Sequence, residues 1–122
     1  MERQRTYEGA LSSLGRNRLN QKKFVEAEEP LSECLELRSK SDPAGWRRFN
    51  VESLLGGSLL GQGRFDEAEP YLISGYQGMK AREAEIDAQF VGLLADAGAR
   101  LVELYERWDK PAEAARWRDA VR

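Results

Sequence analysis

The sequence contains no histidine and only one cysteine, Cys34. Histidine is the commonest general base and the commonest metal ligand, so its absence removes the usual routes to acid–base catalysis and to zinc binding. A single cysteine cannot form an internal disulfide, which fits a reducing compartment such as the cytoplasm. The sequence therefore predicts a cytoplasmic protein that is not an enzyme and that carries no metal and no cofactor.

Long apolar runs and an excess of one charge are lacking too. No run approaches the ~20 apolar residues that a membrane-spanning helix needs, and the first residues lead into no apolar segment of the kind that directs secretion. Charged residues make up 33% of the chain, yet the net charge is only −2. Binding to nucleic acid or to a membrane surface is therefore not expected. The length of 122 residues predicts a single domain over residues 1–122.

What the chain does contain is an internal repeat with a fixed offset. Members of one pattern return 41 residues later, and a third, degenerate copy follows after 46 more. The matched pairs are Leu14 and Leu55, Gly15 and Gly56, Phe24 and Phe65, Ala27 and Ala68, and Leu31 and Leu72. In the third copy Leu101, Tyr105 and Ala114 fit the pattern, whereas Val102 replaces the glycine and Pro111 the aromatic residue. A constant offset of this size is typical of stacked helix pairs, which bury their apolar faces against their neighbours.

The spacing of apolar residues is helical throughout. Steps of three and four residues place side chains on one stripe of a helix, while sustained alternation is absent and Val and Ile are scarce. The sequence predicts an all-α fold of about six helices in three repeats. The expected repeats cover residues 4–39, 43–81 and 87–121, with helices at 4–20, 24–39, 43–61, 66–81, 87–108 and 111–121.

Several residues predict where the helices begin and end. Asp42 and Pro43 are expected to form the N-cap and first position of the third helix, and Asp87 to cap the fifth. The Gly61–Gly63 segment ends a helix, because glycine tolerates the left-handed conformation. Pro30 and Pro70 lie near helix N-termini, where a small bend is expected rather than a break.

The candidate chemical motifs favour structural roles. The glycine-rich stretch 56–63 is no P-loop, because Gly63 is followed by Arg64 instead of lysine and a hydroxyl residue. Cys34 lies on an apolar stripe and is expected to be a small buried side chain. Trp108 and Trp117 are expected to fill the core, whereas Trp46, beside two arginines, suits the core and a partner surface equally.

These residues resemble the tetratricopeptide repeat family. The Leu-Gly pairs, Phe24 and Phe65, and Ala27 and Ala68 match the family's pattern, as do Cys34 and Gly75 further along the second helix of each pair. The 41-residue spacing and the Glu67–Pro70 run are similar to the longer repeats of kinesin light chains and of many bacterial members. The resemblance implies a right-handed superhelical array of three helix-turn-helix pairs.

The C-terminal third carries a second resemblance. The run 101–118 is similar to the tail of repeat regions in some bacterial serine/threonine protein kinases. The chain itself has none of the kinase motifs, neither a glycine-rich loop with its lysine nor His-Arg-Asp or Asp-Phe-Gly segments.

Resemblance to the family implies that the first helix of each pair lines a concave face that binds a peptide. Arginine and asparagine side chains there could hold a carboxylate or peptide backbone, while Glu103 and Arg107 could pair with each other instead. Ser12, Arg16, Ser53 and Gly57 depart from the residues with which some members clamp a C-terminal carboxylate. The expected peptide-binding residues are Arg16, Asn20, Asn50, Ser53, Leu60, Glu103 and Arg107.

The leading functional hypothesis is therefore a non-catalytic protein-interaction scaffold that binds a peptide or partner segment. The alternative is a C-terminal regulatory or docking segment of a larger bacterial protein, such as a kinase, which could also self-associate as a homodimer through its terminal helices. A small enzyme is a distant third, because the chain lacks a credible nucleophile and base.

Overall fold

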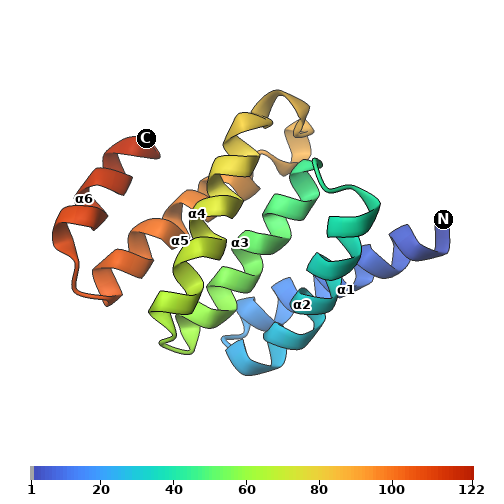
Figure 1. Cartoon of the computed structure of the whole chain (residues 1–122), viewed down its shortest axis with the longest axis horizontal. Coiled ribbons are helices and arrows are strands. Elements are labelled where there is room, and N and C mark those ends of the chain that lie inside the picture. The colour runs from blue at the N-terminus through green and yellow to red at the C-terminus, as the bar shows by residue number, and fades with distance from the viewer. Residues whose placement is uncertain (1) are drawn as a thin grey trace.

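The computed structural model describes residues 2–122, which form an all-α fold (Figure 1). This confirms the predicted fold class. The helices are α1 (Glu2–Asn20), α2 (Phe24–Ser41), α3 (Trp46–Gly61), α4 (Phe65–Ala81), α5 (Gly92–Arg107) and α6 (Pro111–Ala120). Two short 3₁₀ helices, η1 (Glu83–Glu85) and η2 (Ala88–Phe90), connect α4 to α5. Successive helices pack against each other and make three hairpins, α1–α2, α3–α4 and α5–α6.

The three hairpins share one turn. Each contains a residue with positive φ: Lys22 (60°), Gly63 (76°) and Asp109 (57°). The amide of the next residue then donates to a carbonyl five positions earlier, at 2.8 Å in α1–α2, 3.0 Å in α3–α4 and 2.8 Å in α5–α6. This is the hydrogen bond of a Schellman motif. The turns are 41 and then 46 residues apart, so the degenerate third copy has the same local structure as the other two.

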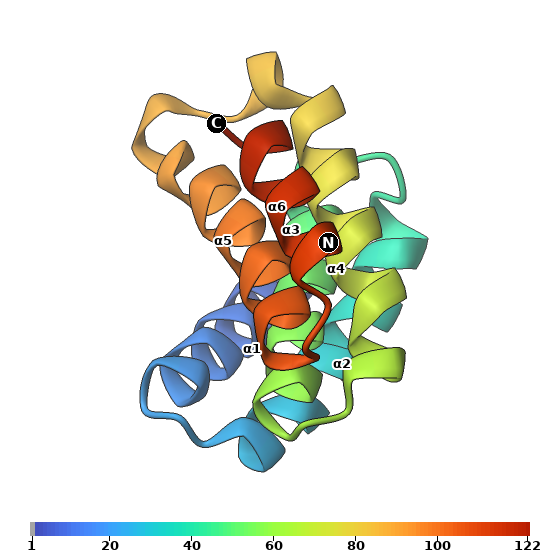
Figure 2. The ribbon, with the colours of Figure 1, turned by 90° about the vertical axis from the view of Figure 1, so that its left-hand side faces the viewer.

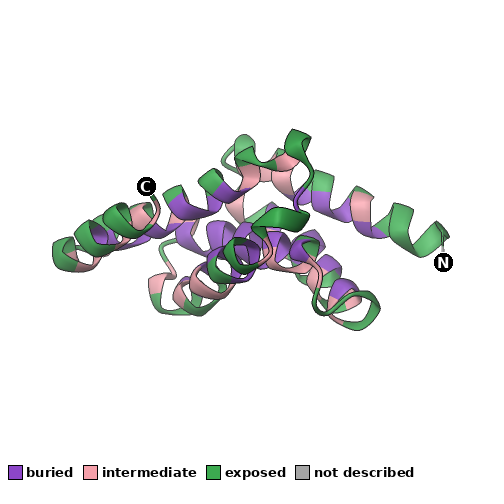
Figure 3. Ribbon diagram, turned by 90° about the horizontal axis from the view of Figure 1, so that it is seen from above, coloured by how far each residue is buried: buried purple, intermediate pink, exposed green. Residues whose placement is uncertain are grey.

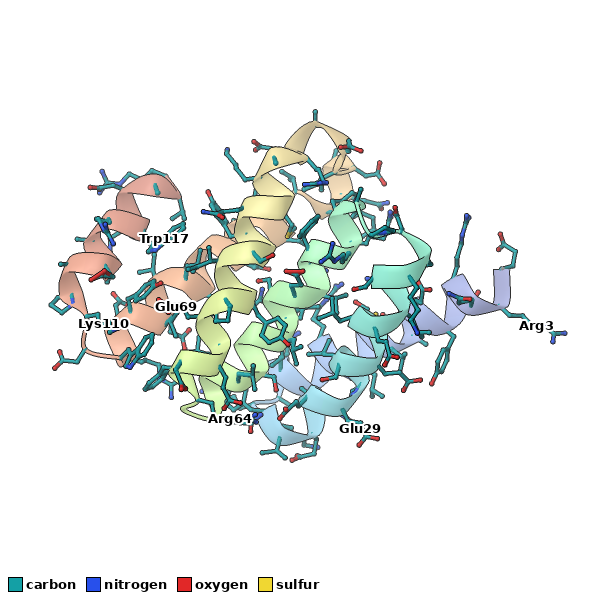
Figure 4. All side chains as sticks on the ribbon, in the orientation of Figure 1. Arg3, Glu29, Arg64, Glu69, Lys110 and Trp117 are labelled. Carbon is teal, nitrogen blue, oxygen red and sulfur yellow. The ribbon has the colours of Figure 1, made fainter. Side chains whose placement is uncertain are left out.

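Glycine lets the first two hairpins close tightly. A Cβ atom at Gly56 would lie 2.7 Å from the Leu72 side chain, and one at Gly15 would overlap Leu31 in the same way. The third hairpin has Val102 at this position, and side chains of both its helices contact α4. The Tyr105 hydroxyl donates to Glu69 at 2.7 Å, and Trp117 meets Tyr76 edge-to-face with ring centroids 6.1 Å apart (Figure 4).

The core is centred on α3, which lies between the first and third hairpins. Every residue from Val51 to Leu60 is buried (Figure 3). Ala27, Ala68 and Ala114, the equivalent alanines of the three second helices, are also buried, as the repeat pattern predicts. Trp108 and Trp117 pack against the main core cluster and Trp46 belongs to it, so the core interpretation holds for all three tryptophans.

Two predicted helix starts are wrong. The third helix begins at Trp46 and not at residue 43, because 42–45 form a turn in which the Gly45 amide donates to the Asp42 carbonyl at 3.1 Å. Asp42 is the C-cap of α2 and not an N-cap. The fifth helix begins at Gly92, since η1, η2 and the buried Ile86 occupy the preceding segment; Asp87 precedes η2 instead.

Other predicted helix features are confirmed. Gly61 ends α3 and Gly63 takes the left-handed conformation. Pro30 and Pro70 lie in the second turn of α2 and α4, and both helices continue through them without a break.

Candidate functional site

α1 and α5 both pack against α3, and Figure 2 shows α1 and α5 on the opposite side of the view from α2 and α4. We call the side formed by α1, α3 and α5 the first-helix face. Gly57 of α3 marks its centre: a Cβ atom there would lie 3.2 Å from the Arg100 side chain of α5 and 3.7 Å from Leu19 of α1. The absence of a side chain at residue 57 therefore leaves room at the point where the three helices meet.

Arg100 is the most informative side chain of this face. Its Nη1 donates to the Ser53 hydroxyl at 3.0 Å, and among residues 2–122 no carboxylate lies within salt-bridge distance. Burial lowers the pKa of Arg100, with a smaller contribution in the same direction from the charge of Arg16, while Asp96 and Glu103 act in the opposite direction. A partly buried guanidinium with one neutral partner favours an incoming anion, because that anion would replace the lost hydration.

Two further polar atoms on the same face lack partners within the described chain. Arg16 Nε and Asn50 Oδ1 are buried atoms without a hydrogen bond in the part of the chain that the structure covers. Buried polar groups are almost always satisfied in folded proteins. Both atoms are enclosed by the surrounding helices, so a ligand at the surface does not reach them directly.

The predicted pair of Glu103 and Arg107 does form. Arg107 Nη1 lies 3.6 Å from Glu103 Oε2 and donates to the Leu60 carbonyl at 3.1 Å. Its guanidinium also lies 5.6 Å from the centroid of the Phe65 ring. These contacts occupy Arg107 in joining α5 to the α3–α4 hairpin.

The seven predicted peptide-binding residues fall into two groups. Arg16 and Asn20 on α1, and Glu103 and Arg107 on α5, are partly or fully exposed. Ser53, Leu60 and Asn50 are 0%, 2% and 3% exposed, so their prediction as accessible contact residues is wrong. They lie under the neighbouring first helices, because α3 is enclosed by α1 and α5.

Arg100 is the residue that sequence reasoning missed. It lies one helical turn before Glu103, which the sequence predicts on this face. The helical spacing could therefore have placed Arg100 on this face. It could not predict the hydrogen bond to Ser53, which lies 47 residues away in the sequence.

Conventional catalytic and metal sites are not seen in residues 2–122. Cys34 is buried and its Sγ donates to the Glu8 carbonyl at 3.3 Å. Burial raises the pKa of the Cys34 thiol, which disfavours the reactive thiolate. No group of three potential His, Cys, Asp or Glu ligands gathers in this range, and no helix in it is long and apolar enough to cross a bilayer.

A comparison of the chain with protein-family models, curated proteins and solved structures finds no match.

Proposed function

We propose that this protein is a non-catalytic interaction module of the tetratricopeptide type whose first-helix face binds an acidic peptide segment. One observation carries the proposal: Arg100 is a partly buried cation on that face, and within residues 2–122 its one hydrogen-bond partner is the Ser53 hydroxyl. The single buried thiol fits a cytoplasmic location.

The chemistry of recognition follows from the groups around Arg100. Burial is the main cause that lowers the pKa of Arg100; Asp96 raises it, and the charge of Arg16 lowers it by a smaller contribution. Two neighbouring guanidinium groups repel each other, and a carboxylate between them removes that repulsion while accepting charge-assisted hydrogen bonds. Asn20 is exposed on α1 and can bond a peptide backbone. An aspartate or glutamate side chain is therefore the feature that the ligand must supply.

A second candidate function is self-association or docking within a larger bacterial protein such as a kinase. Leu14 is 40% exposed on α1, although its equivalent Leu55 is 4% exposed because the preceding hairpin covers it. Tyr7, 47% exposed, adds to the same helix. An outer apolar surface on the first unit of a stack is where a further unit would pack. Light scattering of the wild type and of Leu14→Glu distinguishes this function, because only a dimer that uses α1 becomes monomeric in the variant.

The experiment for the main proposal is selection from a phage-displayed library of random peptides. We expect enriched peptides to share an aspartate or glutamate, and their affinity to fall about tenfold or more in Arg16→Glu, since charge reversal converts attraction to repulsion. Arg116→Glu is the matched control, because Arg116 is exposed on α6 and remote from the first-helix face.

Two outcomes would count against the proposal. Selected peptides without acidic residues would remove the role of Arg100. Equal affinity for the Arg16→Glu and Arg116→Glu variants would mean that the wrong face had been chosen.

A further inference from the structure

A cleft outside the first-helix face lies between the first half of α1, the end of α2 and the start of α3. Its volume is about 1040 Å³, which is at the upper end of the range for small-molecule sites. We call it the N-terminal cleft. It is lined by Gln4, Arg5, Glu8, Gly9, Arg38, Lys40, Ser41, Asp42, Arg47 and Arg48. Five of these residues are basic and two are acidic, although the whole chain has a net charge of −2.

A buried ion pair forms part of the cleft wall. Arg38 Nε lies 3.7 Å from Glu8 Oε1, and the side chains of Arg38 and Glu8 are only 11% and 7% exposed. Glu8 Oε2 also accepts hydrogen bonds from Gln4 at 3.0 Å and from Ser41 at 3.1 Å. Two hydrogen-bond donors therefore hold the Glu8 carboxylate beside the guanidinium of Arg38.

The internal repeat shows that the fold does not require this ion pair. The residues 41 positions after Glu8 and Arg38 are Phe49 and Met79, which pack in the main hydrophobic cluster. The residue equivalent to Ser41 is Arg82, whose guanidinium lies 4.5 Å from the Phe49 ring centroid. An apolar pair thus fills the same position in the second hairpin. Because a buried ion pair is often no more stable than such a pair, charges kept here point to a use beyond folding.

The basic side chains of the cleft differ in what they already bind. Arg48 lies 3.3 Å from Glu52 and Lys40 lies 3.5 Å from Glu36. Arg5 and Arg47 are exposed, and neither has a carboxylate within 4.0 Å among residues 2–122. Arg47 is oriented by the Trp46 ring, whose centroid lies 4.6 Å from its guanidinium carbon.

The start of α3 adds positive potential to the same cleft. No side chain caps its N-terminus and its first turn contains no acidic residue. The amides and the helix dipole both favour an anion at such an end. The Asp42 carboxylate lies beside Gly45 at this end and offsets part of that potential. The contribution of the helix end has the same sign as that of Arg47 and Arg48, which follow directly.

We propose that the N-terminal cleft binds a small ligand that carries two or more linked phosphate groups. A phosphate group presents acceptor oxygens in three dimensions, so it can engage guanidinium groups that approach from α1, α2 and α3 together. A planar carboxylate matches one guanidinium at a time, and Glu8 already fills that role for Arg38. The volume of the cleft exceeds that of one phosphate, which favours a polyphosphate chain or a nucleoside polyphosphate.

The experiment is a calorimetric titration with tripolyphosphate at low and moderate salt, with citrate as a polycarboxylate probe and ATP as a nucleoside probe. We expect tripolyphosphate to bind more tightly than citrate and to lose about tenfold in affinity in Arg47→Gln. Arg47 is exposed, so this variant is expected to keep its fold. Arg116→Gln removes the same charge on α6 and is expected to bind as the wild type does.

Nuclear magnetic resonance locates the site independently of affinity. Tripolyphosphate is expected to shift the amide signals of Gly9 and Gly45, which lie in the cleft wall and at the start of α3, and to leave that of Gly57 unchanged. ATP binding more tightly than tripolyphosphate would identify a nucleoside polyphosphate, and equal binding a polyphosphate chain.

Three results would overturn the proposal. These are equal affinity for citrate and tripolyphosphate, equal losses in Arg47→Gln and Arg116→Gln, and shifts at Gly57 without shifts at Gly9 and Gly45. None of them bears on peptide binding at the first-helix face.

Discussion

The α1–α2 and α3–α4 hairpins have the same backbone pattern, yet one position shows opposite chemistry in the two. Glu8 and Arg38 form an ion pair in the first, whereas Phe49 and Met79 both belong to the main hydrophobic cluster in the second. The backbone around them is alike: the carbonyl of Glu8 faces Cys34 and that of Phe49 faces Gly75, 41 residues later in both cases.

The difference shows at which positions a repeat protein tolerates buried charged residues. The second hairpin has a neighbour on both sides, and Phe49 and Met79 belong to the main hydrophobic cluster. The same hairpin also buries Glu52 in an ion pair with Arg48. The first hairpin has a neighbour on one side only, and its outer end opens into the N-terminal cleft. Charges there keep part of their hydration, which lowers the cost of burying them.

The largest expected effect on stability comes from replacing the Glu8–Arg38 ion pair with the phenylalanine and methionine of the second hairpin. Arg38→Met alone leaves Glu8 buried without a cation and is expected to destabilise the fold by about 3 kcal/mol. Adding Glu8→Phe reproduces the pair of the second hairpin and is expected to return the stability to within about 1 kcal/mol of the wild type. Urea unfolding followed by circular dichroism measures both. A double variant as unstable as Arg38→Met would show that the fold itself requires the ion pair.

The second effect concerns the distance between paired helices. A Cβ atom at Gly75 would lie 2.7 Å from the Ser53 amide nitrogen and 2.8 Å from the Phe49 carbonyl oxygen. Gly75→Ala is therefore expected to cost about 2 kcal/mol, because backbone must move. The equivalent change Cys34→Ala is expected to cost about 1 kcal/mol, for loss of one buried sulfur.

Gly9→Ala is the control for the glycine change itself. No atom lies within 4 Å of a Cβ at Gly9, so this variant is expected to gain up to about 1 kcal/mol from helix propensity. Denaturant midpoints give the order of the three variants, and equal values for Gly75→Ala and Gly9→Ala would refute the close approach of α3 and α4.

A smaller effect is expected at the shared turn. Gly63→Ala places a side chain at φ 76° and is expected to cost about 1 kcal/mol. Lys22→Gly, at the equivalent turn with φ 60°, is expected to stabilise the fold by about 0.5 kcal/mol. Thermal unfolding of the two variants measures the difference, and shifts of the same sign would mean that the two turns are not equivalent.

The smallest effect is a pH dependence at Cys34. Burial raises the pKa of the folded thiol, so the folded state holds this proton more tightly than the unfolded state does. The contribution to stability is complete below the unfolded pKa of about 8.5 and is lost as the pH rises above it. We expect the unfolding free energy of the wild type to fall faster between pH 8 and 10 than that of Cys34→Ala.

Alkylation gives a second measure of the same burial. Iodoacetamide is expected to modify Cys34 about a hundredfold more slowly in the folded protein than in urea. Equal rates would place the thiol at the surface.

The sequence predicted the fold because its signals were local. Apolar steps of three and four, the glycine at residue 63 and the 41-residue offset each depend on neighbours within one hairpin. The predicted helix starts at Asp42 and Asp87 were wrong, because an aspartate there is compatible with both a helix N-cap and a turn. The packing of Ile86 and the turn at Gly45 decided between the two.

The candidate sites were less predictable. Arg16 was placed on the first-helix face by its spacing alone, but Ser53 and Leu60, chosen by the same rule, are buried under α5. The two arginines without carboxylate partners in the N-terminal cleft were not predicted, because no local pattern connects residue 5 to residue 47.

By itself, the sequence determined the helices, their pairing into three hairpins and the absence of histidine chemistry, because these depend on residue type and short-range spacing. Only the tertiary structure decided which polar side chains stay exposed and which charges remain unpaired. Exposure and pairing depend on how the hairpins stack, and stacking brings together residues about 40 positions apart, whose separation in space no local pattern specifies.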